Sequence, residues 1–237
     1  MLRQDVKEAV LSMYEMLSAA GERQHTLGMV QDTGRRAEAT SGRHLDPLAN
    51  VIKSDLIKSG FRPEDLYTRS PKITIPGWYR RSKDWDLVAM NGPEDLVAAI
   101  ELKSISSSFG NNSNNRAEES LGSATDALAA MRNELLGNIR TSTPVLGYVI
   151  IVKDCVASRK VGREKNALFP VDPVFADTNY LDRFRILCER LQADKLYQAV
   201  WLAYADPAHG TVTEPSPILT YDKFIATIKG VLEVHRA

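Results

Sequence analysis

The chain has 237 residues, of which 43% are hydrophobic and 25% charged, and this composition is typical of one globular domain with a buried core. Its 30 basic residues balance its 30 acidic residues, so net charge gives no general attraction to nucleic acid or to an anionic membrane. The two cysteines lack zinc-site spacing, and no apolar run reaches the roughly 20 residues of a membrane-spanning helix. We therefore expect one cytoplasmic domain over residues 1–237, with an N-terminal helical part at about residues 1–60.

Two helical patterns occupy the N-terminal part. Apolar residues recur at helical spacing over residues 6–17, and Gly21 follows where a C-cap glycine is common. A second apolar stripe covers residues 48–56. Asp46 and Pro47 before it predict an N-cap followed by proline at the first helical position.

The rest of the chain alternates strand and helix patterns. The turn signal at residues 91–93 indicates a hairpin between the two runs that flank it. The nearly continuous apolar run at residues 145–152 predicts a strand that is buried on both faces. Thr220 predicts the N-cap of a last helix. The strands are expected at 72–75, 85–90, 96–103, 145–152 and 199–204, and the helices at 116–136, 181–191 and 221–234.

The resulting order of elements is α-α-β-β-β-α-β-α-β-α. This order predicts an α/β fold with a mixed central β-sheet flanked by helices. Many unrelated enzymes share that layout, so function has to be argued from particular residues.

Asp86, Glu101 and Lys103 are the residues that suggest chemistry. The hairpin can bring Asp86 beside Glu101, and strand alternation places Glu101 and Lys103 on one face with Leu102 facing the core. Charges at the end of an apolar strand require a partner or a metal. Mg²⁺ prefers oxygen ligands, which the two carboxylates and the Leu102 carbonyl can supply, and the lysine can position an attacking water. The alternative is an exposed surface pair beside a solvated aspartate, because such spacings also arise by chance.

The sequence around these residues resembles a known family. The triple resembles the PD-(D/E)xK nuclease core, and its surroundings resemble the XhoI-type restriction endonucleases over roughly residues 32–155. The tract Phe-Gly-Asn-Asn-x-Asn-Asn-Arg is far more specific than the triple itself. The segments that carry the resemblance are Pro76-Gly77-Trp78-Tyr79-Arg80, Trp85-Asp86-Leu87, Ile100-Glu101-Leu102-Lys103-Ser104, Ser108-Phe109-Gly110-Asn111-Asn112 with Asn114-Asn115-Arg116, and Leu146-Gly147-Tyr148 ahead of Asp154-Cys155.

The resemblance implies a restriction-endonuclease-like core and a Mg²⁺-dependent homodimer. Such an enzyme cuts double-stranded DNA at a CTCGAG-type palindrome, leaves 5′-phosphate ends, and works beside a DNA methyltransferase that protects the same site in the bacterial host. By motif, Asp86 and Glu101 become metal ligands and Lys103 the water-positioning lysine. Trp85 stands where the bare core pattern has proline, at a position that often varies in these nucleases.

Further candidates carry more than one interpretation. Asp46 is a possible third metal ligand, with Glu38 as its rival, or Asp46 is only a helix cap. The asparagine tract can read bases or clamp phosphates, or it forms a turn before the next helix. A basic loop near residue 160 can hold the phosphate backbone, as can the basic residues at 80–83, although most charge runs are solvated. The DNA-binding candidates are Asn111, Asn112, Asn114, Asn115, Arg116, Arg159, Lys160 and Arg163.

Two other functions stay open at this point. Another PD-(D/E)xK nuclease, for repair or for particular DNA structures, would cut without a fixed sequence. A catalytically inactive DNA-binding protein would bind a palindrome without cutting, although an intact triple argues against it. A small-molecule α/β enzyme lacks support, because there is no glycine-rich phosphate loop and no nucleophile elbow.

Overall fold

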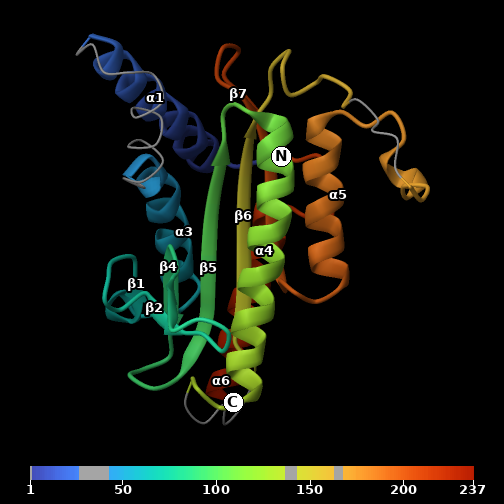
Figure 1. The fold of residues 1–237 in the computed structure, drawn as a ribbon. Helices are drawn as coiled ribbons and strands as arrows, with labels where there is room; N and C mark the ends of the chain where they lie inside the picture. Colours follow the sequence, from blue (N-terminus) through green and yellow to red (C-terminus); the bar gives the residue numbers. More distant parts are fainter. Residues whose placement is uncertain (1, 27–42, 137–142, 163–167) are drawn as a thin grey trace.

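The computed structural model describes residues 2–26, 43–136, 143–162 and 168–237. A six-stranded sheet with the order β1-β4-β5-β6-β7-β8 forms the centre, and a separate two-stranded sheet pairs β2 with β3 (Figure 1). The strands are β1 Leu66–Tyr67, β2 Thr74–Pro76, β3 Ser82–Asp84, β4 Leu87–Met90, β5 Leu96–Ile105, β6 Val145–Lys153, β7 Ala199–Asp206 and β8 Thr211–Thr213. The helices are α1 Gln4–Thr26, α3 Asp46–Lys58, α4 Phe109–Arg132, α5 Tyr180–Ala193 and α6 Tyr221–Arg236, and Arg43–Leu45 forms a short 3-10 turn, η1.

The sheet is mixed, as the order of elements predicts. β5, β6 and β7 run parallel, whereas the outer pairs β1·β4, β4·β5 and β7·β8 are antiparallel. Helices α1, α3 and α6 bury their apolar stripes against one face of the sheet, and α4 and α5 cover the other face (Figure 1). Both faces of the long parallel strands are therefore dry, which explains their nearly continuous apolar sequence. The predicted mixed α/β fold is confirmed.

Several predicted boundaries are wrong in instructive ways. Helix α1 continues past Gly21, since a glycine is tolerated inside a helix at a modest cost. Leu45 is the N-cap of α3 without a side-chain cap bond, so Asp46 is the first helical residue and not the cap. Thr220 does cap α6, because its hydroxyl accepts a hydrogen bond from the Lys223 N–H.

The strand predicted at 72–75 corresponds to β2, but it pairs with β3 instead of joining the central sheet. Helix α4 begins at Phe109 and not at residue 116, so the asparagine tract is helical and not a turn. Asparagine has a poor helix propensity and the tract lacks apolar residues at helical spacing, so the sequence does not predict a helix there. The sequence does not predict the short strands β1, β3 and β8, because strands of two or three residues carry no clear alternation. None of the helices in the described ranges is both long and apolar enough to span a lipid bilayer.

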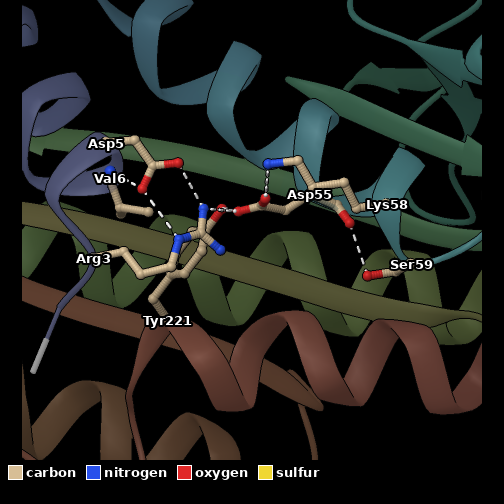
Figure 2. Close-up of polar contacts among 7 residues, drawn as sticks. All are labelled: Arg3, Asp5, Val6, Asp55, Lys58, Ser59 and Tyr221. Carbon is tan, nitrogen blue, oxygen red and sulfur yellow. Dashed lines mark hydrogen bonds and ion pairs between the residues drawn. The ribbon is translucent and has the colours of Figure 1, made fainter.

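A polar cluster around Asp55 ties three helices together on the α1/α3/α6 face (Figure 2). Asp55 is only 4% exposed and accepts hydrogen bonds from Arg3 Nη2 at 2.7 Å, Tyr221 Oη at 2.7 Å and Lys58 Nζ at 3.1 Å. Asp5 binds the same guanidinium from the exposed side. Burial opposes ionisation of Asp55, but the hydrogen bonds from Arg3, Tyr221 and Lys58 outweigh it and lower its pKa.

We expect Asp55→Ala to lower the free energy of unfolding by about 2–4 kcal/mol, because it leaves Tyr221 Oη buried without its partner. Urea unfolding at neutral pH measures this loss. Asp5→Ala is the matched control, and the loss of this exposed partner of Arg3 should cost less than about 1 kcal/mol. A lowered folded-state pKa stabilises the fold only where Asp55 is ionised, so the deficit should shrink as the pH falls into the acid range. Equal losses for both variants would contradict this role of Asp55.

Candidate active site

Asp86 is fixed against strand β5 by two hydrogen bonds. It directly precedes β4, and the antiparallel register pairs Leu87 with Ile100. The Asp86 N–H donates to the Ile100 carbonyl at 3.0 Å, and Asp86 Oδ2 accepts from the Leu102 N–H at 2.7 Å. The predicted hairpin thus brings Asp86 beside the strand that carries Glu101.

Glu101 and Lys103 project from the same face of β5, toward α4, as strand alternation predicts. Leu102 points the other way into the core that α1, α3 and α6 cover. The Glu101 side chain is almost fully buried, and its Oε1 forms an ion pair with Lys103 Nζ. Lys103 Nζ also lies 4.0 Å from Oε2 of Glu119 in α4. The alternative of an exposed surface pair does not describe Glu101, because this carboxylate lies in the interior.

A second lysine, Lys83, completes the charge arrangement. Lys83 lies in β3, and its Nζ is 2.8 Å from Glu101 Oε2 and 5.2 Å from the centre of the Trp85 ring. Each oxygen of Glu101 is therefore paired with a different ammonium group. The sequence predicts Lys83 only as one of the basic residues at 80–83 that can hold phosphates. No local pattern could have signalled its contact with Glu101, because that contact depends on how the β2–β3 hairpin folds over β5.

The two carboxyl groups of the site have opposite protonation preferences. Burial raises the pKa of Asp86 to about 6, the negative charge of Glu101 adds to the rise, and the Leu102 N–H, Lys103 and Lys83 oppose it. Burial also opposes ionisation of Glu101, but the positive charges of Lys103 and Lys83 and the hydrogen bond from Lys103 outweigh it, and the pKa of Glu101 is lowered. Glu101 is therefore the permanent anion, and Asp86 is the acid that titrates closest to neutrality.

Several buried polar atoms around this pair have no hydrogen-bond partner among the described residues. They are Tyr148 Oη, Arg116 Nε and Glu101 Oε2, whose contact with Lys83 is an ion pair without hydrogen-bond alignment. Tyr148 lies opposite Glu101 in the register of β5 and β6. Leaving such atoms unpaired costs about 1–3 kcal/mol each, so they are suited to bind water or a polar ligand.

The donor set fits a hard divalent cation. In the described ranges no group of three or more His, Cys, Asp and Glu side chains gathers, so the protein offers the two carboxylates of Asp86 and Glu101. Mg²⁺ is commonly held by one or two carboxylates, with water and phosphate oxygens as the other ligands. Soft or fully protein-ligated metals do not fit two oxygen donors. The Leu102 carbonyl stays a predicted further ligand.

The structure does not bring Asp46 to the acid pair. Asp46 follows η1, and in η1 His44 Nε2 lies 2.8 Å from Ser104 Oγ. Ser104 alternates with Lys103 along β5, so this contact is on the face opposite to Glu101. Glu38, the rival of Asp46, lies outside the described residues.

The candidate DNA-binding residues lie in two places beyond the strand ends. Asn111, Asn112, Asn114 and Asn115 occupy the first turns of α4, where all but Asn112 are exposed, and Asn112 donates to the Ser107 carbonyl. Arg116 turns toward the site and pairs with Glu119. After β6, Arg159 makes two hydrogen bonds to Asp154, and Lys160 is exposed. Arg163 lies outside the part of the chain that the structure describes.

Comparison with known proteins identifies relatives of one kind. Residues 23–221 match the family described as Restriction endonuclease XhoI. The type II restriction enzyme BstVI of Geobacillus stearothermophilus is 37% identical over 185 residues, which cover 76% of this chain and 81% of that enzyme. The type II restriction enzyme XhoI of Xanthomonas vasicola is 39% identical over 160 residues, which cover 67% of this chain and 63% of that enzyme. No solved structure matches the chain.

We expect Asp86→Asn to stabilise the fold at pH 8 by about 1–3 kcal/mol, because a carboxyl group whose pKa is raised to about 6 resists ionisation in the folded protein. The raised pKa means that stability is lost as the pH rises from the ordinary range of an aspartate through that value. Urea unfolding of both proteins should therefore give nearly equal stabilities at pH 4. Asp84→Asn at an exposed position nearby is the control and should show no such pH dependence. A variant that is no more stable than the parent at pH 8 would overturn this electrostatic assignment.

Proposed function

Since the chain belongs to the restriction endonuclease XhoI family, we propose that Asp86, Glu101 and Lys103 form its Mg²⁺-dependent active site, which cuts double-stranded DNA at a CTCGAG-type palindrome. The family assigns it site-specific DNA cleavage as a type II restriction endonuclease. The observation that carries the residue assignment is that Asp86, directly before β4, lies beside Glu101 on the adjacent strand β5, with Lys103 on the same face as Glu101.

Asp86 and Glu101 would hold the metal. A bound Mg²⁺ supplies positive charge that stabilises the charge developing on the scissile phosphate. Asp86 is oriented by the Leu102 N–H, and Glu101 by Lys103, so both carboxylates are aimed before a ligand arrives. Such preorganisation lowers the reorganisation needed during reaction. Asp46 has no comparable support as a third ligand.

Lys103 would act on the water and the phosphate. Its ammonium group is held beside Glu101 and is partly exposed, so it can reach a water molecule that attacks the phosphorus atom. A cation at this place also offsets the negative charge of the phosphate as the bond to the leaving oxygen breaks, and the cut would leave a 5′-phosphate.

A palindromic site matches a two-fold dimer in which each subunit reads one half-site and cuts one strand. The exposed asparagines of α4, with Arg159 and Lys160 after β6, are proposed DNA contacts beyond the strand ends. Since net charge is zero, affinity would depend on such local contacts. A DNA methyltransferase that modifies the same palindrome would protect the DNA of a bacterial host, and the enzyme would work in the cytoplasm.

Cleavage of unmethylated phage DNA with Mg²⁺ tests the proposal. We expect discrete fragments whose ends map to one palindrome, and the rate should fall by about 10³-fold or more in Glu101→Ala, a change of about 4 kcal/mol. Chelation by EDTA should abolish cutting. Glu94→Ala, an exposed acid near the same hairpin, is the control and should cut at the parental rate.

Other outcomes of this experiment separate the alternatives. A featureless smear would indicate a nuclease without a fixed sequence. Tight duplex binding without cutting would indicate an inactive DNA-binding protein. Unchanged cutting by Glu101→Ala would remove Glu101 from the active site.

Lys83 should compete with the metal for Glu101. Its ammonium group contacts Oε2 of the proposed metal ligand, so we expect Lys83→Met to bind Ca²⁺ about tenfold more tightly in calorimetric titration without DNA. Lys72→Met is the matched control, because Lys72 is exposed and lies over the Tyr67 ring. Weaker or unchanged Ca²⁺ binding by Lys83→Met would show that this lysine supports the site instead of competing for it.

A further inference from the structure

The β2–β3 hairpin presents aromatic side chains to solvent next to the active site. Its tip, residues 77–81, connects the two strands, and there Trp78 is 49% and Tyr79 is 72% exposed. The base of the same hairpin is anchored, because Ile75 and Trp85 are buried in the core under α4. Aromatic residues exposed side by side on a rigid element are typical of a binding surface.

A buried carboxylate holds the hairpin tip in place. Asp126 of α4 is 3% exposed, and its Oδ1 accepts hydrogen bonds from the Trp78 N–H at 2.9 Å and the Tyr79 N–H at 2.7 Å. Its Oδ2 pairs with Arg80 Nε at 2.9 Å. A Cβ on Gly77 would lie 2.4 Å from Asp126 Oδ2, so only glycine fits there. The tip is therefore built to one conformation although its aromatic side chains face outward, which lowers the entropy lost on binding.

The charges of the hairpin favour a polyanionic partner. The hairpin carries three cations, Arg80, Arg81 and Lys83, and one acid, Asp84. Arg80 is paired with Asp126, whereas Arg81 is exposed at the tip and can meet a phosphate. Lys83 reaches Glu101 at 2.8 Å, so the hairpin is continuous with the proposed active site. Figure 1 shows it on the side of the sheet that α4 covers. The partner that has to lie against an active site for phosphodiester cleavage is the duplex itself.

We propose that the hairpin tip is a DNA-contacting element, in which Trp78 and Tyr79 pack against the sugars and bases next to the scissile phosphate. Arg81 binds a neighbouring phosphate, and Asp126 is a positioning residue that fixes the tip without touching DNA. This inference rests on the proposed function, since it names the contacts that bring the substrate to the same site.

Duplex binding without cleavage tests the inference. All further changes are made in the Glu101→Gln protein, so that the duplex is bound but not cut. Fluorescence anisotropy measures the dissociation constant for a duplex that contains the palindrome. We expect the added Trp78→Ala and Tyr79→Ala changes to raise this constant about 30-fold, since an aromatic side chain buried in an interface contributes strongly to binding. Arg81→Gln should instead lower the slope of affinity against salt concentration by about one. Val234→Ala, an exposed apolar residue of α6 behind the sheet, is the control and should leave binding unchanged.

The outcomes separate this inference from the proposed function. If the protein with an intact tip binds the duplex and the Trp78→Ala, Tyr79→Ala variant binds within twofold of it, the tip makes no DNA contact and the nuclease assignment stands. If the protein with an intact tip binds no duplex, both proposals fail. If the variant changes from dimer to monomer in sedimentation, the tip is a subunit interface and the inference is overturned. The thermal unfolding midpoint of the Trp78→Ala, Tyr79→Ala variant should match that of the Glu101→Gln protein. This match would exclude misfolding as the cause of weaker binding.

Discussion

The buried negative charge of Glu101 is the constraint around which the functional side of the molecule is arranged. Glu101 lies on β5, between β4 and β6, where the interior cannot solvate a carboxylate. A buried carboxylate without a partner is strongly destabilising. Two cations offset the charge of Glu101. Lys103 comes from the same strand and Lys83 from a separate hairpin. The ion pair between Lys83 and Glu101 therefore connects the β2–β3 hairpin to the central sheet.

The negative charge of Glu101 also helps to separate the pKa values of the two acids of the site. The lysines keep Glu101 ionised, whereas Asp86 is pushed toward protonation by burial and by Glu101 itself. Pairs of titratable groups whose environments move their pKa values apart are typical of active sites, and they commonly cost the fold some stability. On the opposite face of the sheet a buried carboxylate has a structural role, because Asp55 is satisfied by three donors and joins α1, α3 and α6. Its pKa is lowered, in contrast to that of Asp86.

Helices α4 and α5 cover the face of the sheet that carries Glu101 and Lys103, and they have different roles. The N-terminal turns of α4 expose the asparagine tract and turn Arg116 toward Glu119 and the site. Further along the same helix, Asp126 fixes the tip of the hairpin that carries Lys83. Helix α5 packs beside α4 and closes the core over β6 and β7. One rigid helix thus connects the acid pair, the candidate base-reading residues and the exposed aromatic tip.

The sequence alone determined the fold class, the hairpin that carries Asp86, and the shared face of Glu101 and Lys103. The hairpin follows from the turn signal at residues 91–93, and the other two features follow from side-chain periodicity, which is two residues in a strand and 3.6 in a helix. The tertiary structure alone decided that Lys83 reaches Glu101, that Asp126 holds the hairpin tip, and that His44, just before α3, contacts Ser104 on the face opposite to Glu101. It also decided that the asparagine tract is helical, against its propensity. Contacts between elements far apart in the chain depend on how their faces pack, and no local pattern records that choice.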